Sequence, residues 1–322
     1  MTLRDIPGTE LRVSPICLGT ALFGATIDTP MSYALLDAFF ERGGNFIDTA
    51  RSYSDWIPGE RARSEGLIGR WLADRRNRER TIIATKGGHA AADGTPRLNA
   101  RELASDIDAS LARLHLETID IYYLHRDAPA TPVEPIIDAL HVYVRAGKIR
   151  YLGCSNWRAE RIRDANAYAA SSGQTGFVVN QPMWNAAMIN SATLADRSLV
   201  VMDDEMRRLH VETGMACVPY SSQAGGLFSK LTSMLWALQF RFGRGPTGYP
   251  QGPNLARFRV IKSMARARSM PVSQVVLAYL LSQPFATIPV VGCRNVDQLL
   301  ETMASADVRL SASDLAAIEA AS

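Results

Sequence analysis

The feature of this sequence that most restricts its fold is the regular alternation of short apolar runs with longer amphipathic segments. Each of eight candidate strands is followed by a candidate helix, which predicts a parallel sheet covered by helices. Eight units also match the number that closes a (β/α)₈ TIM barrel, with an open doubly wound sheet as the alternative. The candidate strands are 16–19, 45–48, 81–86, 119–125, 149–155, 177–181, 216–220 and 286–291. The candidate helices are 30–42, 60–78, 100–114, 132–146, 158–171, 203–213, 272–282 and 295–306.

Local signals refine this pattern. Residues 2–6 and 10–13 flank a Pro-Gly turn and predict an N-terminal β-hairpin. Four helix starts carry capping signals, at Thr29-Pro30, Thr131-Pro132, Asn99 and Ser311. No linker divides residues 1–322, so we expect a single domain with long loops at the carboxyl ends of the strands. The longest, 221–254, is rich in Gly and Pro and is the candidate lid over a cofactor or substrate.

Composition limits the classes of function. The 35 Lys and Arg nearly balance 32 Asp and Glu, so the net charge of +3 indicates no nucleic-acid partner. Apolar runs are too short to span a membrane, and residues 1–12 resemble no secretory signal. The four cysteines are widely spaced and form no metal-binding pattern, which favours reduced thiols, no metal and a cytoplasmic location. The oligomeric state is not readable.

One motif is misleading. Gly243, Gly245 and Gly248 satisfy the G-x-G-x-x-G spacing of dinucleotide-binding folds. That motif requires a preceding strand, a following helix and an acidic residue about 20 positions later. Prolines interrupt the sequence here, and the next acid is Asp297. We therefore expect a flexible loop without a phosphate-binding role.

Polar residues at the ends of candidate strands carry the functional signal. Asp48, Lys86 and His125 each close an apolar run, and Tyr53 follows Asp48 in the next loop. Individually these residues fit a turn cap, a solvated lysine, a rim aromatic and a core histidine. In a barrel, however, all strand carboxyl ends share one face. A lysine beside a tyrosine would lower the phenol pKa and assist proton transfer, while histidine could bind a carbonyl oxygen.

Motifs along the whole chain resemble the aldo-keto reductase superfamily. They are 45–50 with Ser52-Tyr53, 84–87, 122–126, 147–150, 153–156, Asn180-Gln181, 218–221 and 291–294 with Gln298. The resemblance implies a (β/α)₈ barrel that binds NADP(H) in extended form. It also implies a catalytic tetrad of Asp48, Tyr53, Lys86 and His125.

The resemblance further assigns residues to the cofactor. It places Gly19 and Thr20 near the nicotinamide and stacks Tyr220 on the ring. The carboxamide would be bound by Ser155, Asn156 and Gln181, and the pyrophosphate would lie beside Ser221, Gln223 and Gly226. The 2′-phosphate and adenine end would be formed by Gly292, Cys293, Arg294, Gln298 and Thr302. Gln223, Cys293 and Thr302 differ from the residues usual in the family. Trp56, Trp157 and Trp184 follow strand ends and are candidates for the substrate pocket.

Together these observations predict an NADPH-dependent carbonyl reductase in which Tyr53 donates the proton. The substrate would be an aldehyde, ketone or ketosugar-like molecule. The first alternative is an NADP-dependent alcohol or sugar dehydrogenase working in the oxidative direction. More distant alternatives are a lyase that forms a Schiff base through Lys86 and a non-catalytic nucleotide-sensing subunit.

Overall fold

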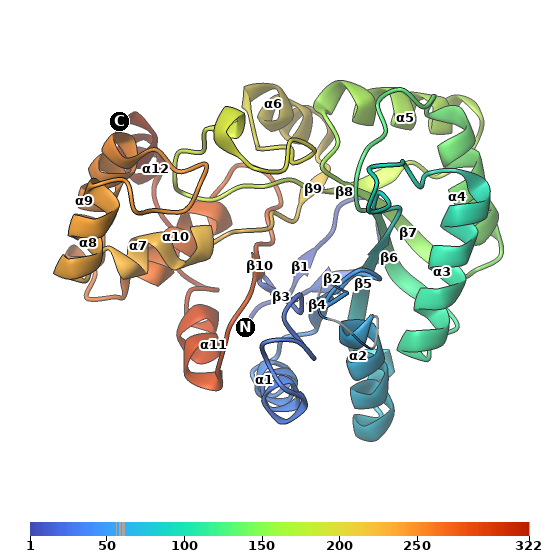
Figure 1. Cartoon of the computed structure of the whole chain (residues 1–322), viewed down its shortest axis with the longest axis horizontal. Helices are drawn as coiled ribbons and strands as arrows, with labels where there is room; N and C mark the ends of the chain where they lie inside the picture. Colours follow the sequence, from blue (N-terminus) through green and yellow to red (C-terminus); the bar gives the residue numbers. More distant parts are fainter. Residues whose placement is uncertain (56, 58, 60–61, 322) are drawn as a thin grey trace.

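Eight parallel strands form the centre of the protein (Figure 1). The computed structural model describes residues 1–55, 57, 59 and 62–321. Neighbouring strands follow the order β10-β3-β4-β5-β6-β7-β8-β9. Their bounds are β3 Cys17–Gly19, β4 Phe46–Asp48, β5 Ile82–Gly87, β6 Ile119–Leu124, β7 Ile149–Ser155, β8 Phe177–Gln181, β9 Ala216–Cys217 and β10 Val290–Val291. All eight predicted strands are confirmed, although β9 and β10 contain only two residues each, where five and six were expected.

The two ends of the sheet meet. Cys217 of β9 forms a parallel bridge with Thr287. The amide of Cys217 donates to the Ala286 carbonyl at 2.8 Å, and the amide of Ile288 donates to the Cys217 carbonyl at 2.8 Å. Residues 286–289 lead directly into β10, which pairs with β3. The sheet is therefore closed, which confirms the predicted (β/α)₈ barrel and excludes the open doubly wound sheet.

Helices surround the strands, and each buries apolar residues against the sheet or against a neighbouring helix. They are α1 Thr29–Glu41, α2 Arg63–Arg75, α3 Ala100–Leu114, α4 Glu134–Arg145, α5 Ala159–Ser171, α6 Asp204–Thr213, α10 Val272–Leu281, α11 Val296–Met303 and α12 Ala312–Ala320. Short 3₁₀ helices lie at η1 Arg78–Arg80 and η2 Ser191–Thr193. In the described part of the chain, no helix combines the length and apolar character needed to cross a bilayer.

The helix starts confirm two capping predictions and correct two. Asn99 accepts from the amide of Glu102, and Ser311 with Asp314 forms a full capping box. At α1, however, the cap is the Asp28 carboxylate rather than Thr29, because Asp28 has the extended backbone that reaches the amide of Met31. The Thr131-Pro132 prediction is also wrong, because α4 begins two residues later and its N-cap residue makes no side-chain bond.

The segment 221–254 is not the extended loop that its composition suggested. It contains η3 Ala224–Gly226, α7 Leu227–Lys230, α8 Met234–Arg241 and the start of α9 Gln251–Ala267. Buried Leu227, Phe228 and Phe240 anchor these helices to the core, an effect that outweighs the Gly and Pro content. The G-x-G-x-x-G residues lie in the loop between α8 and α9, preceded by a helix rather than a strand. The expected absence of a dinucleotide-binding strand–turn–helix unit there is confirmed.

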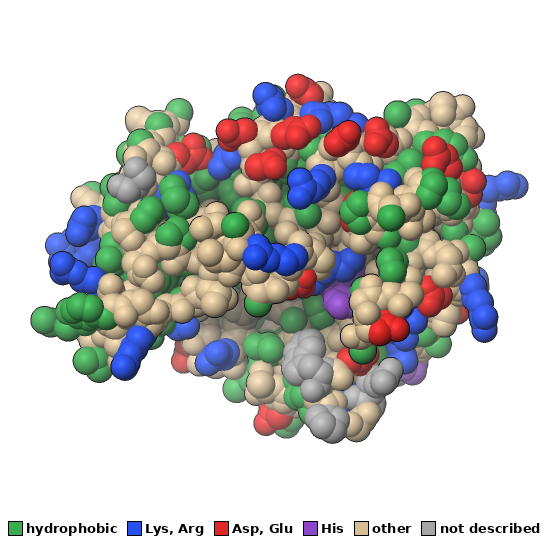
Figure 2. Space-filling view, turned by 45° about the horizontal axis from the view of Figure 1, so that its top comes forward, with side chains coloured by type: hydrophobic (Ala, Val, Ile, Leu, Met, Phe, Trp, Pro, Cys, Tyr) green, Lys and Arg blue, Asp and Glu red, His purple; other side chains and the backbone are tan. Residues whose placement is uncertain are grey.

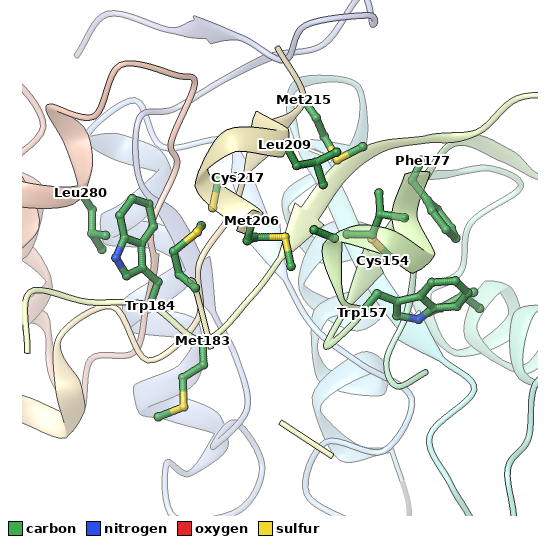
Figure 3. Packing of buried hydrophobic residues seen from close by; sticks show 14 of the residues in the cluster. Cys154, Trp157, Phe177, Met183, Trp184, Met206, Leu209, Met215, Cys217 and Leu280 are labelled. Atoms are coloured by element: carbon green, nitrogen blue, oxygen red, sulfur yellow. The ribbon is translucent and has the colours of Figure 1, made fainter. Parts of the chain in front are cut away.

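The core has an inner and an outer layer. The antiparallel hairpin of β1 Arg4–Asp5 and β2 Arg12–Val13 packs Ile6 and Leu11 against inward-facing strand residues such as Ile121 and Val179. It thereby closes the barrel at the end opposite the strand carboxyl termini. In the outer layer, residues of β7 to β9 meet the surrounding helices, as shown for Cys154, Met206 and Cys217 (Figure 3). All four cysteines are buried and free, and burial raises the pKa of Cys17, Cys154 and Cys217 well above the ordinary thiol value.

We expect Ser311→Ala to lower the free energy of unfolding by about 1 kcal/mol, because the substitution removes the capping hydroxyl of α12. Chemical denaturation measures the change. Ser263→Ala is the control, since Ser263 is exposed in the middle of α9 and caps no helix. An equal loss of stability in both variants would contradict the capping assignment.

Candidate active site

Four side chains predicted from separate parts of the sequence meet at the carboxyl end of the barrel. Asp48 ends β4, Lys86 lies near the end of β5, and His125 follows β6 directly. Tyr53 lies in the loop after β4, where its amide donates to the Ala50 carbonyl at 3.1 Å. The amide of His125 donates to the carbonyl of Gly87 at 2.8 Å, so adjacent strands set the relative positions of Lys86 and His125.

Lys86 is the centre of this group. Its Nζ donates to both carboxylate oxygens of Asp48, at 2.7 and 2.6 Å, and to the carbonyl of Thr49 at 2.9 Å. It also lies 3.0 Å from the hydroxyl oxygen of Tyr53. Asp48 and Lys86 are both 1% exposed, so neither charge could be buried without the other. Burial lowers the pKa of Lys86, but the charges of Asp48 and Tyr53 and their hydrogen bonds together outweigh burial, and the pKa is raised overall.

The electrostatics of Tyr53 differ from the expectation. The sequence predicted that Lys86 would lower the phenol pKa below its ordinary value. Burial instead raises the pKa of Tyr53, and the opposing effect of Lys86 is partly cancelled by Asp48. The prediction was wrong because the sequence does not show that the half-buried phenol is desolvated in the cavity wall and lies beside Asp48. The raised pKa keeps the Tyr53 phenol protonated at neutral pH.

His125 is a neutral imidazole. Burial lowers its pKa well below 6.5, and the charges of Lys86 and Arg126 lower it further. Its ring lies edge to face with Tyr53, with 5.9 Å between ring centres. Its Nδ1 is buried and has no hydrogen-bond partner among the described residues. The imidazole can bind an oxygen atom beside the phenol, but it cannot act as a cationic proton source.

These residues border a cavity of about 740 Å³, the size of a typical small-molecule site. Asp48, Tyr53 and His125 line it, and Lys86 lies behind them in contact with Asp48 and Tyr53. The predicted cofactor residues that also line it are Gly19, Ser155, Asn156, Gln181, Tyr220, Ser221, Gln223, Gly226, Gly292, Cys293, Arg294, Gln298 and Thr302. The structure thus brings together residues from all parts of the chain.

Three predicted site residues do not line the cavity, and a fourth lies outside the described residues. Thr20 is buried behind the cavity wall, with its hydroxyl bonded to the carbonyl of Asp48 and to Ser64. Trp157 is buried against Phe177, and Trp184 packs against Tyr279 and Phe285. Neither tryptophan lines the cavity, because both side chains turn into the outer core. Trp56 lies outside the described residues.

One end of the cavity wall is a connected set of amides and hydroxyls. Asn156 Nδ2 donates to the His125 carbonyl at 3.2 Å, and its Oδ1 accepts from the Tyr220 hydroxyl at 2.7 Å. Ser155 Oγ donates to the Gln181 carbonyl at 2.8 Å. Gln181 Nε2 donates to Asp48 Oδ1 at 2.9 Å, which joins this wall to the ion pair. The wall is therefore rigid and presents both donors and acceptors.

Sequence reasoning missed several residues of the cavity. Lys230 and Glu301 are charged residues that line it, and Arg126 and Leu199 border it beside His125. Glu301 lies three residues after Gln298 on α11, so helical periodicity could have identified it. Lys230 could not be found in this way, because the helix that carries it was expected to be a loop.

Asp106 of α3 was also missed, although it supports the site from outside the cavity. Its carboxylate accepts from the amide of Gly88 at 3.0 Å and from Arg97 at 2.7 Å. Arg51 Nε lies 2.9 Å away, and the amide of Arg51 donates to the carbonyl of Lys86 at 3.0 Å. One buried carboxylate therefore ties the loop that carries Tyr53 to the end of β5.

Comparison with known proteins places this site in a family. Residues 15–322 match the model of the Aldo/keto reductase family. The chain belongs to the aldo/keto reductase family. It is 31% identical to norsolorinic acid reductase B of Aspergillus parasiticus, over 97% of this chain and 82% of that protein. It is 29% identical to aryl-alcohol dehydrogenase [NADP(+)] of Phanerodontia chrysosporium, over 95% of this chain and 81% of that protein. It is 31% identical to aldo-keto reductase ausK of Aspergillus calidoustus, over 97% of this chain and 80% of that protein.

Family membership confirms the predicted resemblance and the enzyme class. This aldo/keto reductase is an oxidoreductase of a family that uses a nicotinamide cofactor, and its substrates are small molecules. The donor set of the cavity fits such a cofactor: amides and hydroxyls at the catalytic end suit a carboxamide, and Lys230 and Arg294 suit phosphates.

We expect Asp106→Asn to destabilise the protein by about 3 kcal/mol, because two arginines lose a buried charged partner. Asp108→Asn on the same helix is the control. Its exposed pair with Lys148 should contribute less than about 1 kcal/mol. Thermal melts compare the two variants, and equal effects would show that the Asp106 network has no special role.

Proposed function

We propose that this aldo/keto reductase reduces the carbonyl group of a small molecule with NADPH, and that Tyr53 donates the proton. The observation that carries the proposal is the position of the Tyr53 hydroxyl, at the cavity wall and 3.0 Å from Lys86 Nζ. A protonated phenol held by a buried cation can release its proton to an oxygen that gains negative charge. Lys86 then stabilises the resulting phenolate.

Asp48 and Lys86 act on Tyr53 rather than on the substrate. Lys86 has no acceptor atom, so it must contact the phenol oxygen as a donor. The phenol proton is thereby directed away from Lys86, toward the cavity or toward the Asp48 oxygen at 3.4 Å. His125, as a neutral imidazole, would orient the substrate oxygen next to the phenol.

When bound, the nicotinamide supplies the hydride. The residues that would hold it are Ser155, Asn156, Gln181 and Tyr220 at the catalytic end, with Ser221, Gln223 and Gly226 beside the pyrophosphate. Lys230 adds a cation next to this second group. The cavity passes continuously from these residues to Arg294, which supports binding of an extended dinucleotide.

The preference for NADPH over NADH rests on opposing charges at the far end. Arg294 would pair with the 2′-phosphate. Glu301 lies in the same part of the cavity and is fixed by a hydrogen bond from Ser273, so it would repel that phosphate. An NADP(+)-dependent relative supports the choice of NADPH. Glu301 reduces the expected difference in affinity between NADPH and NADH.

The oxidative direction remains the second candidate, favoured by the relative that is an aryl-alcohol dehydrogenase. The relatives also support an aromatic carbonyl compound or alcohol as substrate. A Schiff-base lyase is disfavoured, because the amine of Lys86 is charged and committed to Asp48. We further infer that residues 1–322 act as one catalytic domain and that the protein works in the cytoplasm, where its free cysteines stay reduced.

Closure of the segment 221–254 over a bound cofactor stays a prediction. Only its first part, from Ser221 to Lys230, lines the cavity. A moving lid would therefore consist of η3 and α7 rather than the Gly-rich loop after α8.

We expect Tyr53→Phe to lower turnover by about 10² to 10⁴-fold while NADPH affinity stays nearly unchanged, because only the proton donor is removed. Steady-state reduction of an aromatic aldehyde and fluorescence titration measure the two effects. Tyr123→Phe is the matched control, since this buried phenol has no hydrogen-bond partner among the described residues and does not line the cavity. Wild-type turnover in Tyr53→Phe would remove Tyr53 from the mechanism.

The pH–rate profile tests the protonation states. The raised pKa of Tyr53 places loss of the active phenol above pH 10.0, and the lowered pKa of His125 predicts no inflection near 6.5. Lys86→Met should cut turnover and move the alkaline limb to higher pH, because the cation that favours phenolate is gone. An inflection near 6.5 in the wild type, or an unchanged limb in Lys86→Met, would contradict these assignments.

We expect Arg294→Ala to weaken NADPH binding about tenfold and to leave NADH binding unchanged, because only NADPH offers a phosphate partner. Fluorescence titrations with both cofactors measure the ratio. Glu301→Gln should strengthen NADPH binding, because it removes the charge that would repel the 2′-phosphate. Arg145→Ala on the distant helix α4 serves as the neutral control. Equal loss of both cofactors in Arg294→Ala would exclude the phosphate contact.

A further inference from the structure

The near-neutral net charge conceals a strong separation of charge along the chain. Residues 213–296 contain nine Lys and Arg and no Asp or Glu. The rest of the chain contains the other 26 of the 35 basic residues and all 32 acidic residues. The acid-free segment includes α7, α8, α9 and α10, which lie together at the left end of the molecule in Figure 1. One end of the protein is therefore basic, and the rest is net acidic.

Several cations at this end are not neutralised. Arg241, Arg244, Arg259 and Arg266 are exposed, and none forms an ion pair within the described part of the chain. Arg268 is different, because it lies 2.6 Å from Asp314 of α12. Arg241 ends α8 and Arg244 follows it, while Arg259 and Arg266 lie two helical turns apart on α9, which contacts α8. They form a positive surface that interacts with no acidic group of the structure described.

The same end carries an apolar surface, which we call the α8 ridge: Met234, Leu235, Leu238 and Phe242. These side chains are 80%, 69%, 43% and 78% exposed. Their spacing places them on one face of the helix, opposite buried Phe240. They are four of the seven large hydrophobic side chains that are exposed in the described residues. Figure 2 shows hydrophobic side chains projecting at the left end beside Lys and Arg.

The ridge is an unusual feature for a protein surface. A cluster of projecting apolar residues within a basic surround is the pattern of segments that bind membrane interfaces. Anionic headgroups attract the arginines, and the apolar side chains enter the boundary between headgroups and acyl chains. We propose that the α8 ridge and its flanking arginines dock this enzyme reversibly on an anionic lipid surface. This inference goes beyond the reduction reaction and does not depend on it.

The charge and the apolar side chains of this surface favour a lipid surface over a second copy of the chain or a nucleic acid. In a symmetric contact between two copies, the same basic surface would face itself, and the unpaired arginines would repel. A nucleic acid would satisfy the charge but would leave the exposed aliphatic side chains of Met234, Leu235 and Leu238 without a partner. A lipid surface satisfies both the charge and the apolar ridge.

The α8 ridge lies close to the border of the cavity. Ser229 and Lys230 line the cavity at the end of α7, and residues 231–233 connect them to α8. Lys230 Nζ lies 5.4 Å from the centre of the Trp236 ring, so the cavity border and the helix are in contact. Docking through α8 would therefore bring the mouth of the cavity close to the membrane surface. An apolar carbonyl compound dissolved in the bilayer would then be near the site.

The experiment is sedimentation of the full chain with two kinds of vesicle, equimolar phosphatidylcholine and phosphatidylserine, or phosphatidylcholine alone. We expect binding to the anionic vesicles that is lost at high salt, and little binding to the neutral ones. Leu235→Ser with Phe242→Ser should weaken binding about tenfold or more. Arg259→Gln with Arg266→Gln should weaken it about fivefold for each charge removed.

Val142→Ser with Val211→Ser is the matched control, because these valines are 64% and 60% exposed on α4 and α6. This control should bind vesicles like the wild type, and all variants should keep wild-type melting temperature and solution turnover. Three outcomes would overturn the proposal: no binding to anionic vesicles at low salt, equal binding by the ridge variant, or a solution dimer that the ridge variant dissociates. Tight binding to duplex DNA that is insensitive to the ridge substitutions would overturn it as well.

Discussion

The rest of this structure depends on the buried ion pair of Asp48 and Lys86. Neither charge is stable alone inside the barrel, so each must be delivered to the other within hydrogen-bond distance. The pairing of β4 with β5 achieves this, and the lysine also donates to the Thr49 carbonyl and to the phenol oxygen of Tyr53. The ion pair thus converts the register of two neighbouring strands into a fixed position for the Tyr53 phenol.

The surroundings maintain that position from two sides. Within the cavity wall, Gln181 connects Asp48 to the amides and hydroxyls that would hold a carboxamide. Behind the wall, Asp106 ties the loop of Tyr53 to the end of β5. The amide wall and the Tyr53 phenol are therefore linked through Asp48, which contacts both Gln181 and Lys86.

The structure also divides its surface by charge. The acidic and basic residues of the first 212 residues pair frequently, whereas Arg241, Arg259 and Arg266 form no ion pair with any residue that the structure describes. The four residues around the ion pair lie in the first part of the chain, from Asp48 to His125. The later part contributes the outer cavity border and the projecting ridge, so a surface for docking can change without disturbing the ion pair.

The sequence by itself determined the eight strand–helix units and the positions of Asp48, Lys86 and His125 at strand ends, because alternating hydrophobicity is a local property. Only the tertiary structure decided which side chains are buried and in which direction they point. It showed that burial raises the pKa of Tyr53 despite Lys86, since desolvation depends on atoms far away in the chain. It turned Trp157 and Trp184 into the core, and it ordered 221–254 into helices, because packing contributes more than glycine and proline content costs.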